Sequence, residues 1–468
     1  MSAHPTDPRP DARRRARVLV VGSGFAGFTA VRGLEKRLAP DVAELVLVTP
    51  VDYLLYSPLL PEVATGTIEP RHVAVPLRQT LRRTRVLPGH VTEVDLDGRT
   101  ATVRGRDGTD AVEPWDRLVL APGSVTRQFD IPGVAEHAHG FKTLTEAVYL
   151  RDHVLAQLDA ADALPDTDAG RAERRERLTV VAVGAGYTGT EFVAQMQTWL
   201  RGIATRWDTI DPADVHWVLV DVAPHVLPEL GPRLGEHALG VLTRRGVDVR
   251  LGVSVASAGP TAVELTDGST VASRTLVWGA GVAASPLVAT LGLPTEKGRL
   301  VVRADLTVPG HEHVWALGDA AAVPDLAVPA GPDGRRRPTP PTAQHAQRQG
   351  PAVARNVAAS LGVGRARPYK HRDLGLVADL GGPDAVAKPL GISLTGRLAK
   401  AVTRGYHLYA LPGAPARVRV ATDWLLAAAL PTQVVRLSAI RDEDALIPSA
   451  QSTRIYPARP EEVPSLDR

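Results

Sequence analysis

Short apolar runs, each followed by glycines and then by a stretch with helical spacing, recur along the 468-residue chain. The first run, Arg17 to Val21, leads through a glycine-rich turn into a predicted helix from Phe28 to Leu38. The second run, Leu178 to Val183, leads in the same way into a predicted helix from about Thr190 to Leu200. Fully apolar strands alternating with helices are typical of parallel sheets. The pattern therefore predicts an α/β fold that contains two strand–turn–helix units.

The first turn has the glycine spacing of a dinucleotide-binding motif, with Gly22, Gly24 and Gly27. The first glycine makes the tight turn, the second lets a pyrophosphate approach the backbone, and the third lets helix and strand pack closely. An acidic residue at the end of the next strand normally holds a ribose hydroxyl. Here that strand ends at Thr49, so we expect its hydroxyl or the backbone to make this contact.

The second turn repeats the motif with Gly184, Gly186 and Gly189, and here the following strand ends at Asp221. Two copies of the motif, each after a buried strand, indicate dinucleotide binding far more strongly than one copy. Neither residue after Asp221 is basic, so a 2'-phosphate would meet repulsion and find no partner. The second unit is therefore predicted to bind NAD(H) in preference to NADP(H).

Three later segments complete the two units. The strand from Val314 ends in Gly-Asp319, which resembles the aspartate that holds the FAD ribityl chain in flavoproteins with two dinucleotide domains. A returning strand that ends near Gly123 belongs to the same predicted FAD domain. Its counterpart in the NAD domain ends at Ala280 and Gly281. The FAD domain is thus expected to be discontinuous, with the NAD domain inserted into it.

Composition excludes several other kinds of chemistry. The chain has no cysteine, which rules out disulfides, thiolate ligands and cysteine redox chemistry. We find no metal-ligand spacing and no hydrolase nucleophile motif, so no metal site is predicted. The net charge of +3 does not indicate nucleic acid, and no apolar run is long enough to span a membrane.

Beyond these motifs, much of the chain resembles type II NADH:quinone oxidoreductases. One similar segment, residues 53–66, follows the second strand. Three more lie where that family has its NADH loop and its quinone-site helix: 184–191, 278–286 and 340–350. Two short ones lie later in the chain: 373–375 and 423–424. The resemblance implies hydride transfer from NADH to FAD, then transfer of two electrons to a membrane quinone. Disulfide reductases and sulfide:quinone oxidoreductases would need cysteines that are absent here.

The resemblance also implies roles for single residues. Glu191 would lie near the flavin and nicotinamide, where it positions NADH or relays a proton; otherwise it is a first-turn helix carboxylate. Ala343 would contact FAD, and Gln344 would face the quinone carbonyl unless it is a surface amide. Arg348 stands where the family usually has a second Gln, four residues on and so on the same helical face.

Arg348 leaves the electron acceptor open. Its cation would hydrogen-bond a quinone oxygen or stabilise an anionic semiquinone, or it would block quinone and recruit an acidic acceptor. His345 is a further departure from the family pattern, and Pro351 removes a backbone donor that would otherwise continue the helix.

A membrane surface is the predicted partner of the C-terminal region. A helix predicted from Ser393 to Leu411 has an apolar face, with cations at Arg397, Lys400, Arg404 and His407 on other faces. Such a basic amphipathic helix lies in the headgroup layer of anionic lipid. An apolar stretch that ends before Pro431 would do the same or pack on the first helix. The alternative is that both helices form a core or a subunit interface.

These expectations define a domain plan: a disordered tail (1–15), an FAD domain (16–150 and 300–365), an NAD(H) domain (178–299) and a membrane-surface or dimerisation region (366–468). Residues 164–177 are expected to be a charged connection. A cytoplasmic protein peripheral to the inner membrane face is predicted, with a homodimer as a further expectation. Two other functions stay open: a soluble NADH-dependent flavin reductase using a protein carrier or oxygen, and an NADH-sensing flavoprotein with slow turnover.

Overall fold

A computed structural model describes residues 15–127, 129–332, 334–371 and 373–452. The predicted N-terminal tail lies outside these residues, except for its last position. The chain divides into two compact units, each built from three segments: residues 1–52, 81–123 and 290–370 form the first, and residues 53–80, 124–289 and 371–468 the second. The predicted domain boundaries stay a prediction.

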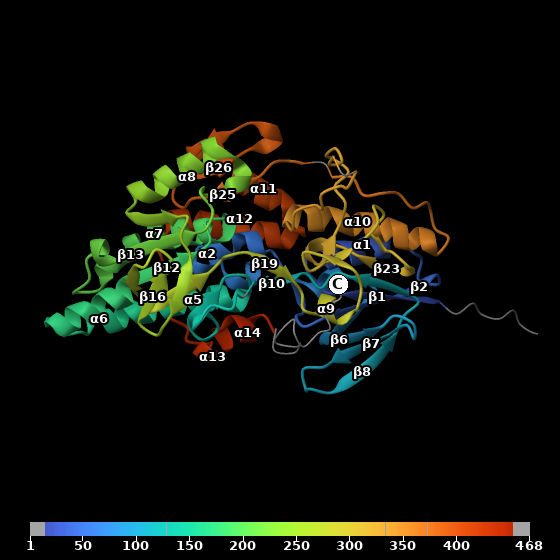
Figure 1. The fold of residues 1–468 in the computed structure, drawn as a ribbon, viewed down its shortest axis with the longest axis horizontal. Coiled ribbons are helices and arrows are strands. Elements are labelled where there is room, and N and C mark those ends of the chain that lie inside the picture. Colours follow the sequence, from blue (N-terminus) through green and yellow to red (C-terminus); the bar gives the residue numbers. More distant parts are fainter. Residues whose placement is uncertain (1–14, 128, 333, 372, 453–468) are drawn as a thin grey trace, which may run out of the picture. The chain divides into compact units, whose positions relative to one another are not determined.

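The first unit is organised around a six-stranded sheet with the order β22-β23-β9-β1-β2-β5 (Figure 1). Five of its strands are parallel, and β22 pairs antiparallel with β23. The strand bounds are β1 Ala16–Val21, β2 Ala43–Thr49, β5 Arg85–Pro88, β9 Arg117–Leu120, β22 Thr307–Val308 and β23 His311–Ala316. The central strands β1 and β9 are almost wholly buried toward their carboxyl ends, as expected for apolar strands covered on both faces.

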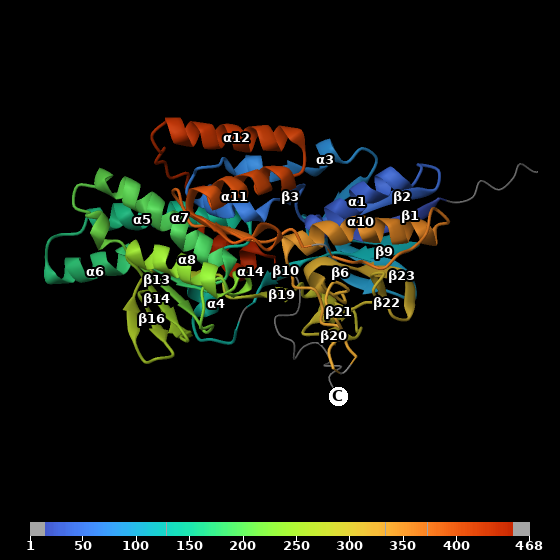
Figure 2. The same cartoon turned by 90° about the horizontal axis from the view of Figure 1, so that it is seen from above.

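Two long helices of the first unit, α1 (Phe25–Arg37) and α10 (Ala343–Ser360), pack side by side along the sheet (Figures 1 and 2). Pro351 lies inside α10, which continues through it as one helix. Two small antiparallel or mixed sheets complete the unit: β6 His90–Asp95, β7 Thr100–Arg104 and β8 Asp110–Pro114; and β20 Thr295–Glu296, β21 Arg299–Val301 and β24 Ala321–Ala322.

The second unit is organised around a five-stranded parallel sheet with the order β11-β18-β12-β13-β14. The bounds are β11 Ala138–Gly140, β12 Thr179–Val183, β13 His216–Asp221, β14 Val247–Leu251 and β18 Thr275–Trp278. Its helices include α2 Leu60–Ala64, α5 Leu144–Asp162, α6 Asp168–Leu178, α7 Tyr187–Ile203 and α8 Pro232–Arg244. Further strands are β3 Tyr53–Leu55, β4 Ala74–Pro76, β10 Ser124–Thr126, β15 Val255–Ala258, β16 Ala262–Leu265, β17 Thr270–Ala272 and β19 Val282–Ala284. One mostly parallel and one wholly parallel sheet, each with its helices, confirm the predicted α/β class with two Rossmann-like units.

The segment expected to be a charged connection is instead mostly helical. Helix α6 begins after Thr167, whose side chain accepts a hydrogen bond from the backbone N–H of Gly170. This N-cap satisfies one of the free donors of the first turn. The helix shows almost no apolar periodicity, and for that reason the hydrophobic pattern did not indicate it.

The C-terminal region of the second unit contains a three-stranded antiparallel sheet, two long helices and two short ones, α13 Asp442–Ala445 and α14 Ile447–Ala450. The bounds are β25 Val377–Asp379, β26 Ala385–Ala387, β27 Leu394–Thr395, α11 Gly396–Ala410 and α12 Ala414–Ala429. Helix α11 buries its small and polar residues Ala399, Thr403 and His407, while Leu398 is 72% exposed. The apolar face that the sequence predicted thus lies partly outward. None of the described helices is both long and apolar enough to cross a membrane.

The cations expected on the outer faces of this helix are distributed differently. Lys400 forms an ion pair with buried Asp379, and His407 is itself buried. The guanidinium of Arg404 lies over the ring of Trp424 at 5.0 Å. Only Arg397 among the four is exposed. The expectation that all four supply surface charge was therefore wrong, because three of them are used for contacts inside the unit.

Candidate functional site

The glycine turn of the first unit has the geometry that the motif predicts. Gly22 has φ +94°, and a Cβ there would lie 2.2 Å from the carbonyl oxygen of Ala121. A Cβ at Gly27 would lie 1.9 Å from the carbonyl oxygen of Gly22. At Gly24, by contrast, a Cβ would meet no atom within 4 Å. Two glycines thus close the turn, and the third leaves open space in front of the N-terminus of α1.

That N-terminus is suited to an anion. Gly24 is the N-cap residue and has no side chain that could cap the free N–H groups of the first turn. These N–H groups and the helix dipole favour a phosphate at this position. The residues present therefore fit the pyrophosphate of a dinucleotide.

Thr49, at the end of β2, lies beside this turn. Its hydroxyl is within 2.8 Å of the Ser23 hydroxyl and 3.1 Å from the carbonyl oxygen of Val51. The side chain is only 1% exposed. The Thr49 hydroxyl is thus engaged inside the unit, and the ribose contact by this hydroxyl or by the backbone stays a prediction.

Asp319 lies in the turn after β23, as predicted, and a residue that the sequence reasoning missed holds this turn. Gly318 has φ +71°, and its N–H donates to the side-chain oxygen of Gln349 at 2.7 Å. Gln349 is fully buried and donates in turn to the Thr339 hydroxyl at 3.2 Å. A glutamine in the buried face of α10 was the available signal, since a buried amide requires partners.

The glycine turn of the second unit repeats these features. Gly184 has φ +107°, a Cβ at Gly189 would lie 1.9 Å from the Gly184 carbonyl oxygen, and a Cβ at Gly186 would meet nothing within 4 Å. Gly186 is the N-cap of α7 and again has no side-chain cap. Ala280 and Gly281 follow β18, and the preceding Gly279 packs against Gly184. This second turn fits a second dinucleotide by the same physical argument.

Asp221 lies at the end of β13, next to the glycine turn. Its Oδ2 accepts a hydrogen bond from the N–H of Ala185 at 2.5 Å, and its Oδ1 accepts one from the N–H of Ala223 at 2.7 Å. These bonds fix the orientation of the carboxylate. A carboxylate has about four acceptor positions, so capacity remains for a ribose hydroxyl.

Helix α10 of the first unit carries the residues predicted to face the electron acceptor. Gln344 is 9% exposed and lies in the first turn, which Thr342 caps by accepting from the N–H of His345. The Nδ1 of His345 lies 3.2 Å from the Tyr369 hydroxyl. Arg348, one turn later, is half-buried, and its Nη1 is buried without a hydrogen-bond partner among the described residues. Gln344 and Arg348 thus lie one turn apart on α10, and one guanidinium nitrogen of Arg348 is available to donate a hydrogen bond to a ligand.

The second unit contains a cluster of buried charged groups, which we call the carboxyl cluster: Glu62 on α2, Glu191 on α7, Asp379 on β25 and Lys400 on α11. Glu62, Glu191 and Asp379 are 4%, 9% and 3% exposed. Lys400 Nζ lies 2.6 Å from both oxygens of Asp379, and Glu191 accepts a hydrogen bond from the Asp379 N–H at 2.7 Å. Three carboxyl groups therefore share one ammonium in a buried place.

This imbalance shifts the protonation of both glutamates. Burial, together with the carboxylates of Asp379 and Glu62, raises the pKa of Glu191 from 4.5 to about 8. Burial and Asp379 likewise raise the pKa of Glu62 to about 7, although Lys400, the indole of Trp424 and Arg404 oppose that change. Burial outweighs the single ammonium because a charge is costly to remove from water. Near neutral pH this cluster holds protons.

A second buried pair lies in the same unit. The Tyr56 hydroxyl is 3.1 Å from Nδ1 of His407. Burial lowers the pKa of His407 to about 4 and raises that of Tyr56 well above 10.0. Both groups are therefore neutral at physiological pH and make a neutral hydrogen bond.

Sequence reasoning named Glu191 as a candidate site residue but did not name Glu62, Asp379 and Lys400 as such, although they lie beside it in the carboxyl cluster. Glu62 interrupts a run of apolar residues that are buried in the structure, which is the one local signal. Asp379 and Lys400 lie far along the chain, and only the packing of α11 against β25 and β26 brings them here. Among the predicted residues, the first unit carries Gln344 and Arg348, and the second carries Glu191.

Two dinucleotide-fitting turns on parallel sheets, without any cysteine, define a class of nicotinamide- and flavin-dependent oxidoreductase. A family model described as pyridine nucleotide-disulphide oxidoreductase matches residues 16–350. Type II NADH:quinone oxidoreductase NdhA from Mycobacterium tuberculosis is 34% identical over 88% of this chain and 86% of its own length. A type II NADH:quinone oxidoreductase from Staphylococcus aureus is 29% identical over 83% of this chain and 93% of its own length. The chain belongs to the pyridine nucleotide-disulphide oxidoreductase family and, within it, to the type II NADH:quinone oxidoreductases.

A solved structure agrees with this fold. NDH2 from Plasmodium falciparum in complex with NADH superposes with a TM-score of 0.81 at 17% identity, covering 90% of this chain and 100% of that chain. At this identity the likeness concerns the fold alone. The family that the sequence resembled is thus confirmed by the 34% identical relative.

Proposed function

We propose that this protein is an FAD-dependent NADH dehydrogenase that transfers electrons from NADH to a membrane quinone. One observation carries the proposal: the chain has two glycine turns of similar geometry. Each is followed by a helix whose N-terminal N–H groups have no side-chain cap and can bind an anion. Two dinucleotides are what an NADH-oxidising flavoprotein must hold. When bound, FAD accepts a hydride equivalent from NADH and returns two electrons to the quinone.

The residues of the first unit hold FAD in this proposal. Gly22, Gly24 and Gly27 receive the pyrophosphate, and Asp319 faces the ribityl chain. The remaining contacts come from Thr49, Gly123 and Ala343. Gln349 acts indirectly, because its bond to the Gly318 N–H positions the turn that presents Asp319.

The residues of the second unit hold NADH. Gly184, Gly186 and Gly189 receive its pyrophosphate, with Ala280 and Gly281 beside it. Asp221 binds the adenosine ribose hydroxyls, and its negative charge selects against the 2'-phosphate of NADPH. The hydrogen bonds from Ala185 and Ala223 keep the carboxylate in place for both tasks.

Glu191 supplies proton chemistry. Reduction of a quinone to a quinol by NADH takes up one proton overall. A carboxyl with a pKa of about 8 is protonated at neutral pH and can release that proton when a base forms nearby. Glu62 and Asp379 keep Glu191 protonated, while Lys400 limits the repulsion inside the carboxyl cluster.

Gln344 and Arg348 face the acceptor. An amide and a guanidinium both donate hydrogen bonds to a quinone oxygen, and the guanidinium adds a positive charge. The free Nη1 of Arg348 supports this role. Arg348 makes the site electrostatically favourable for an oxygen that gains negative charge during reduction.

A quinone acceptor leads us to place the protein at the inner face of the cell membrane. Helices α11 and α12, and the residue directly after α12, expose large apolar side chains: Leu398, Tyr409, Val418, Leu425, Leu426 and Leu430. Exposed apolar groups on adjacent helices fit the interfacial layer of a bilayer, and Arg397 and Arg419 offer cations to anionic lipid. Association into a homodimer stays a prediction.

An anaerobic reduction experiment tests the proposed function. The purified holoprotein is mixed with NADH, the flavin absorbance near ~450 nm is followed, and a soluble quinone is then added. Bleaching followed by fast recovery is expected. Bleaching without recovery would instead favour the flavin reductase with a protein carrier or the slow sensor, and absence of bleaching would reject NADH as the donor.

A further inference from the structure

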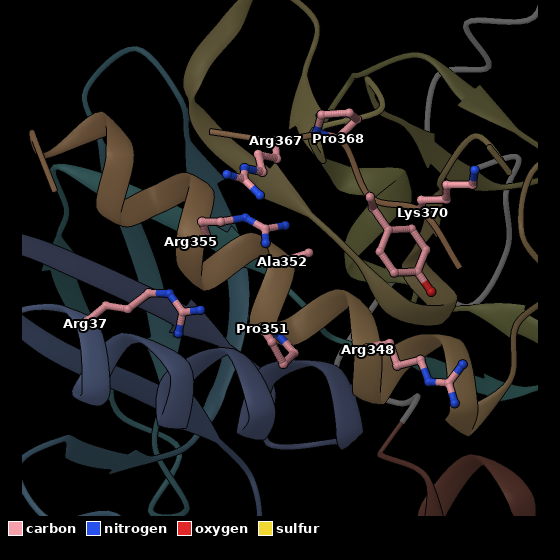
Figure 3. A pocket seen from close by; sticks show the side chains of 9 residues that line it. Arg37, Arg348, Pro351, Ala352, Arg355, Arg367, Pro368 and Lys370 are labelled. Carbon is pink, nitrogen blue, oxygen red and sulfur yellow. The ribbon is translucent and has the colours of Figure 1, made fainter. Parts of the chain in front are cut away.

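The first unit has a cavity of about 320 Å³ beside α1 and α10 (Figure 3). Its walls carry five cationic side chains and no acidic one: Arg37, Arg348, Arg355, Arg367 and Lys370. The side chains of Arg37, Arg355 and Arg367 converge on one end of it, whereas the guanidinium of Arg348 points away from these three (Figure 3). We call Arg37, Arg355 and Arg367 the arginine triad.

Close helix packing brings the triad together. A Cβ at Gly33 would lie 2.6 Å from the Cβ of Ala354, so only glycine lets α1 approach α10 this closely. Arg37 lies one turn after Gly33, and Arg355 follows Ala354 directly. The Nη1 of Arg37 donates to the Gly33 carbonyl oxygen at 3.3 Å, which directs its guanidinium along this contact.

A buried amide adds the third arginine. Asn356 is 3% exposed, and its side chain binds the backbone of Arg367 twice: Nδ2 donates to the Arg367 carbonyl oxygen at 3.0 Å, and Oδ1 accepts from its N–H at 2.9 Å. Nδ2 also donates to the carbonyl oxygen of Asp305 at 2.7 Å. The segment that carries Arg367 is thus held against α10 by a satisfied polar side chain, not by the arginine itself.

The charges of the triad are not neutralised by an acidic side chain. No ion pair of the described residues involves Arg37, Arg355 or Arg367, whereas Arg17, Arg85, Arg104 and Arg303 of the same unit each lie within 4 Å of a carboxylate. Burial, Arg367 and Arg37 lower the pKa of Arg355. The Nε of Arg355 is buried and has no hydrogen-bond partner among the described residues. Folding therefore assembles like charges and leaves a donor unsatisfied.

We propose that the arginine triad binds a phosphate-bearing anion with at least two negative charges. Planar guanidinium groups bind phosphate oxygens through paired hydrogen bonds, and three of them around one cavity match a diphosphate or a phosphomonoester. The anion would neutralise the repulsion and satisfy Arg355. Its source is either a soluble phosphate compound or the headgroup of a phospholipid, which share this chemistry.

This site is distinct from the predicted FAD phosphate site. That site is at the N-terminus of α1, whereas Arg37 is its last residue. Twelve residues of α-helix separate the two ends by about 18 Å. The proposal therefore does not depend on the assignment of FAD or NADH.

Calorimetric titration of the holoprotein with inorganic pyrophosphate tests the proposal. We expect saturable binding with one pyrophosphate per chain, and affinity that falls as salt is raised. Arg355→Gln and Arg367→Gln should each weaken binding at least about tenfold, since each removes a charge-assisted pair. Arg365→Gln is the matched control, because Arg365 is exposed, lies on the same segment and does not line the cavity; a change of less than about twofold is expected.

Thermal unfolding without pyrophosphate separates binding from folding. If the triad is a strained binding site, Arg355→Gln should raise Tm by about 1–3 °C, because it removes repulsion and an unsatisfied donor. A purely structural arginine would lower Tm when replaced. No saturable binding by the unmodified protein at millimolar pyrophosphate, or equal affinity in Arg355→Gln, Arg367→Gln and parent, overturns the proposal.

Vesicle binding then distinguishes the two sources. The holoprotein is sedimented with vesicles of phosphatidylcholine with or without phosphatidic acid, in the presence or absence of pyrophosphate. If binding needs phosphatidic acid, is displaced by pyrophosphate and is weakened by Arg355→Gln, the triad takes a lipid headgroup. If vesicle binding changes with neither phosphatidic acid, pyrophosphate nor Arg355→Gln, while pyrophosphate still binds the protein, the triad binds a soluble phosphate compound.

Discussion

The buried glutamates determine how this protein responds to pH. In an unfolded chain Glu191 releases its proton near 4.5, whereas burial and the neighbouring carboxylates raise its pKa to about 8 in the folded chain. The stabilisation by this bound proton is full below pH 4.5 and is lost as the pH rises through 8. Glu62 follows the same course with a pKa of about 7 in the folded chain.

Stability is therefore expected to fall by a few kcal/mol between about pH 5 and about pH 8, since a tenfold change in a proton-binding constant corresponds to about 1.4 kcal/mol. Glu191→Gln should reduce this slope, because the amide stays neutral and still accepts the Asp379 N–H. Thermal midpoints measured across that range check the prediction. Glu93→Gln, at an exposed glutamate of β6, should leave the slope as in the parent; an unchanged slope in Glu191→Gln would contradict a protonated Glu191.

The proposed role of Arg348 in holding the acceptor can be tested by substitution. Arg348→Gln places a side-chain amide at this position and removes the guanidinium, whose Nη1 has no hydrogen-bond partner among the described residues. We expect flavin reduction by NADH to proceed as in the parent, while KM or kcat for quinone changes by about tenfold, the cost of one charge-assisted hydrogen bond. Stopped-flow measurement of the two half-reactions separates these effects. Equal quinone kinetics in variant and parent would remove Arg348 from the site.

We propose that Asp221 determines which nicotinamide coenzyme is accepted. Asp221→Ala removes both the ribose acceptor and the repulsion of a 2'-phosphate, so the preference for NADH over NADPH should shrink by about tenfold or more. The ratio of kcat/KM for the two coenzymes measures this. Asp221→Asn is the informative control, since it keeps the shape and loses the charge. An unchanged ratio in both variants would mean that the ribose is held elsewhere.

At the scale of elements, the contact between α1 and α10 depends on missing side chains. A Cβ at Gly350 would lie 2.0 Å from Oγ1 of Thr29 and 2.7 Å from the backbone nitrogen of Ala30. The backbone of α1 cannot yield locally without moving the whole helix, so the clash must separate the two helices. That movement would also displace Gln349 from the Gly318 turn.

Gly350→Ala is therefore expected to destabilise the protein by about 1–3 kcal/mol, the usual cost of overpacking, and to lower the FAD content after purification. Gly405→Ala in α11 is the matched helical control, because a Cβ there meets no atom within 4 Å. It should stabilise by about 0.5–1 kcal/mol through helix propensity. Thermal unfolding and the ratio of flavin to protein absorbance give both readings; a stable, fully flavinated Gly350→Ala would show that the helices can adjust.

At the scale of the whole molecule, the proposed membrane attachment rests on the exposed apolar side chains of α11 and α12. Burying one leucine in lipid is worth about 1.5–3 kcal/mol. The double variant Leu398→Gln, Leu425→Gln should thus bind vesicles at least about tenfold more weakly than the parent, measured by sedimentation. Both side chains are more than 70% exposed, so folding should be little affected. Val112→Gln, on β8 and 64% exposed, is the control; equal loss in it would indicate nonspecific adsorption.

Local sequence determined the class of this protein. Buried strands, the glycines that follow them and the helices beyond are neighbours in the chain, and their spacing follows from backbone geometry that only glycine permits. Both glycine turns, the two Rossmann-like units and the family were therefore readable in advance. Helix α6 was not, because its polar residues leave no periodicity and only its cap marks where it begins.

Only the tertiary structure decided which charged side chains are buried and which of them lie together. Lys400 and His407 looked like surface cations because helical spacing tells which residues share a face, but it does not tell which face is buried. The carboxyl cluster joins Glu62, Glu191 and Asp379 from distant parts of the chain, and the arginine triad joins α1 to residues more than 300 positions later. The cost of burying a charge, and hence its pKa and its ligand, depends on neighbours that only the folded chain supplies.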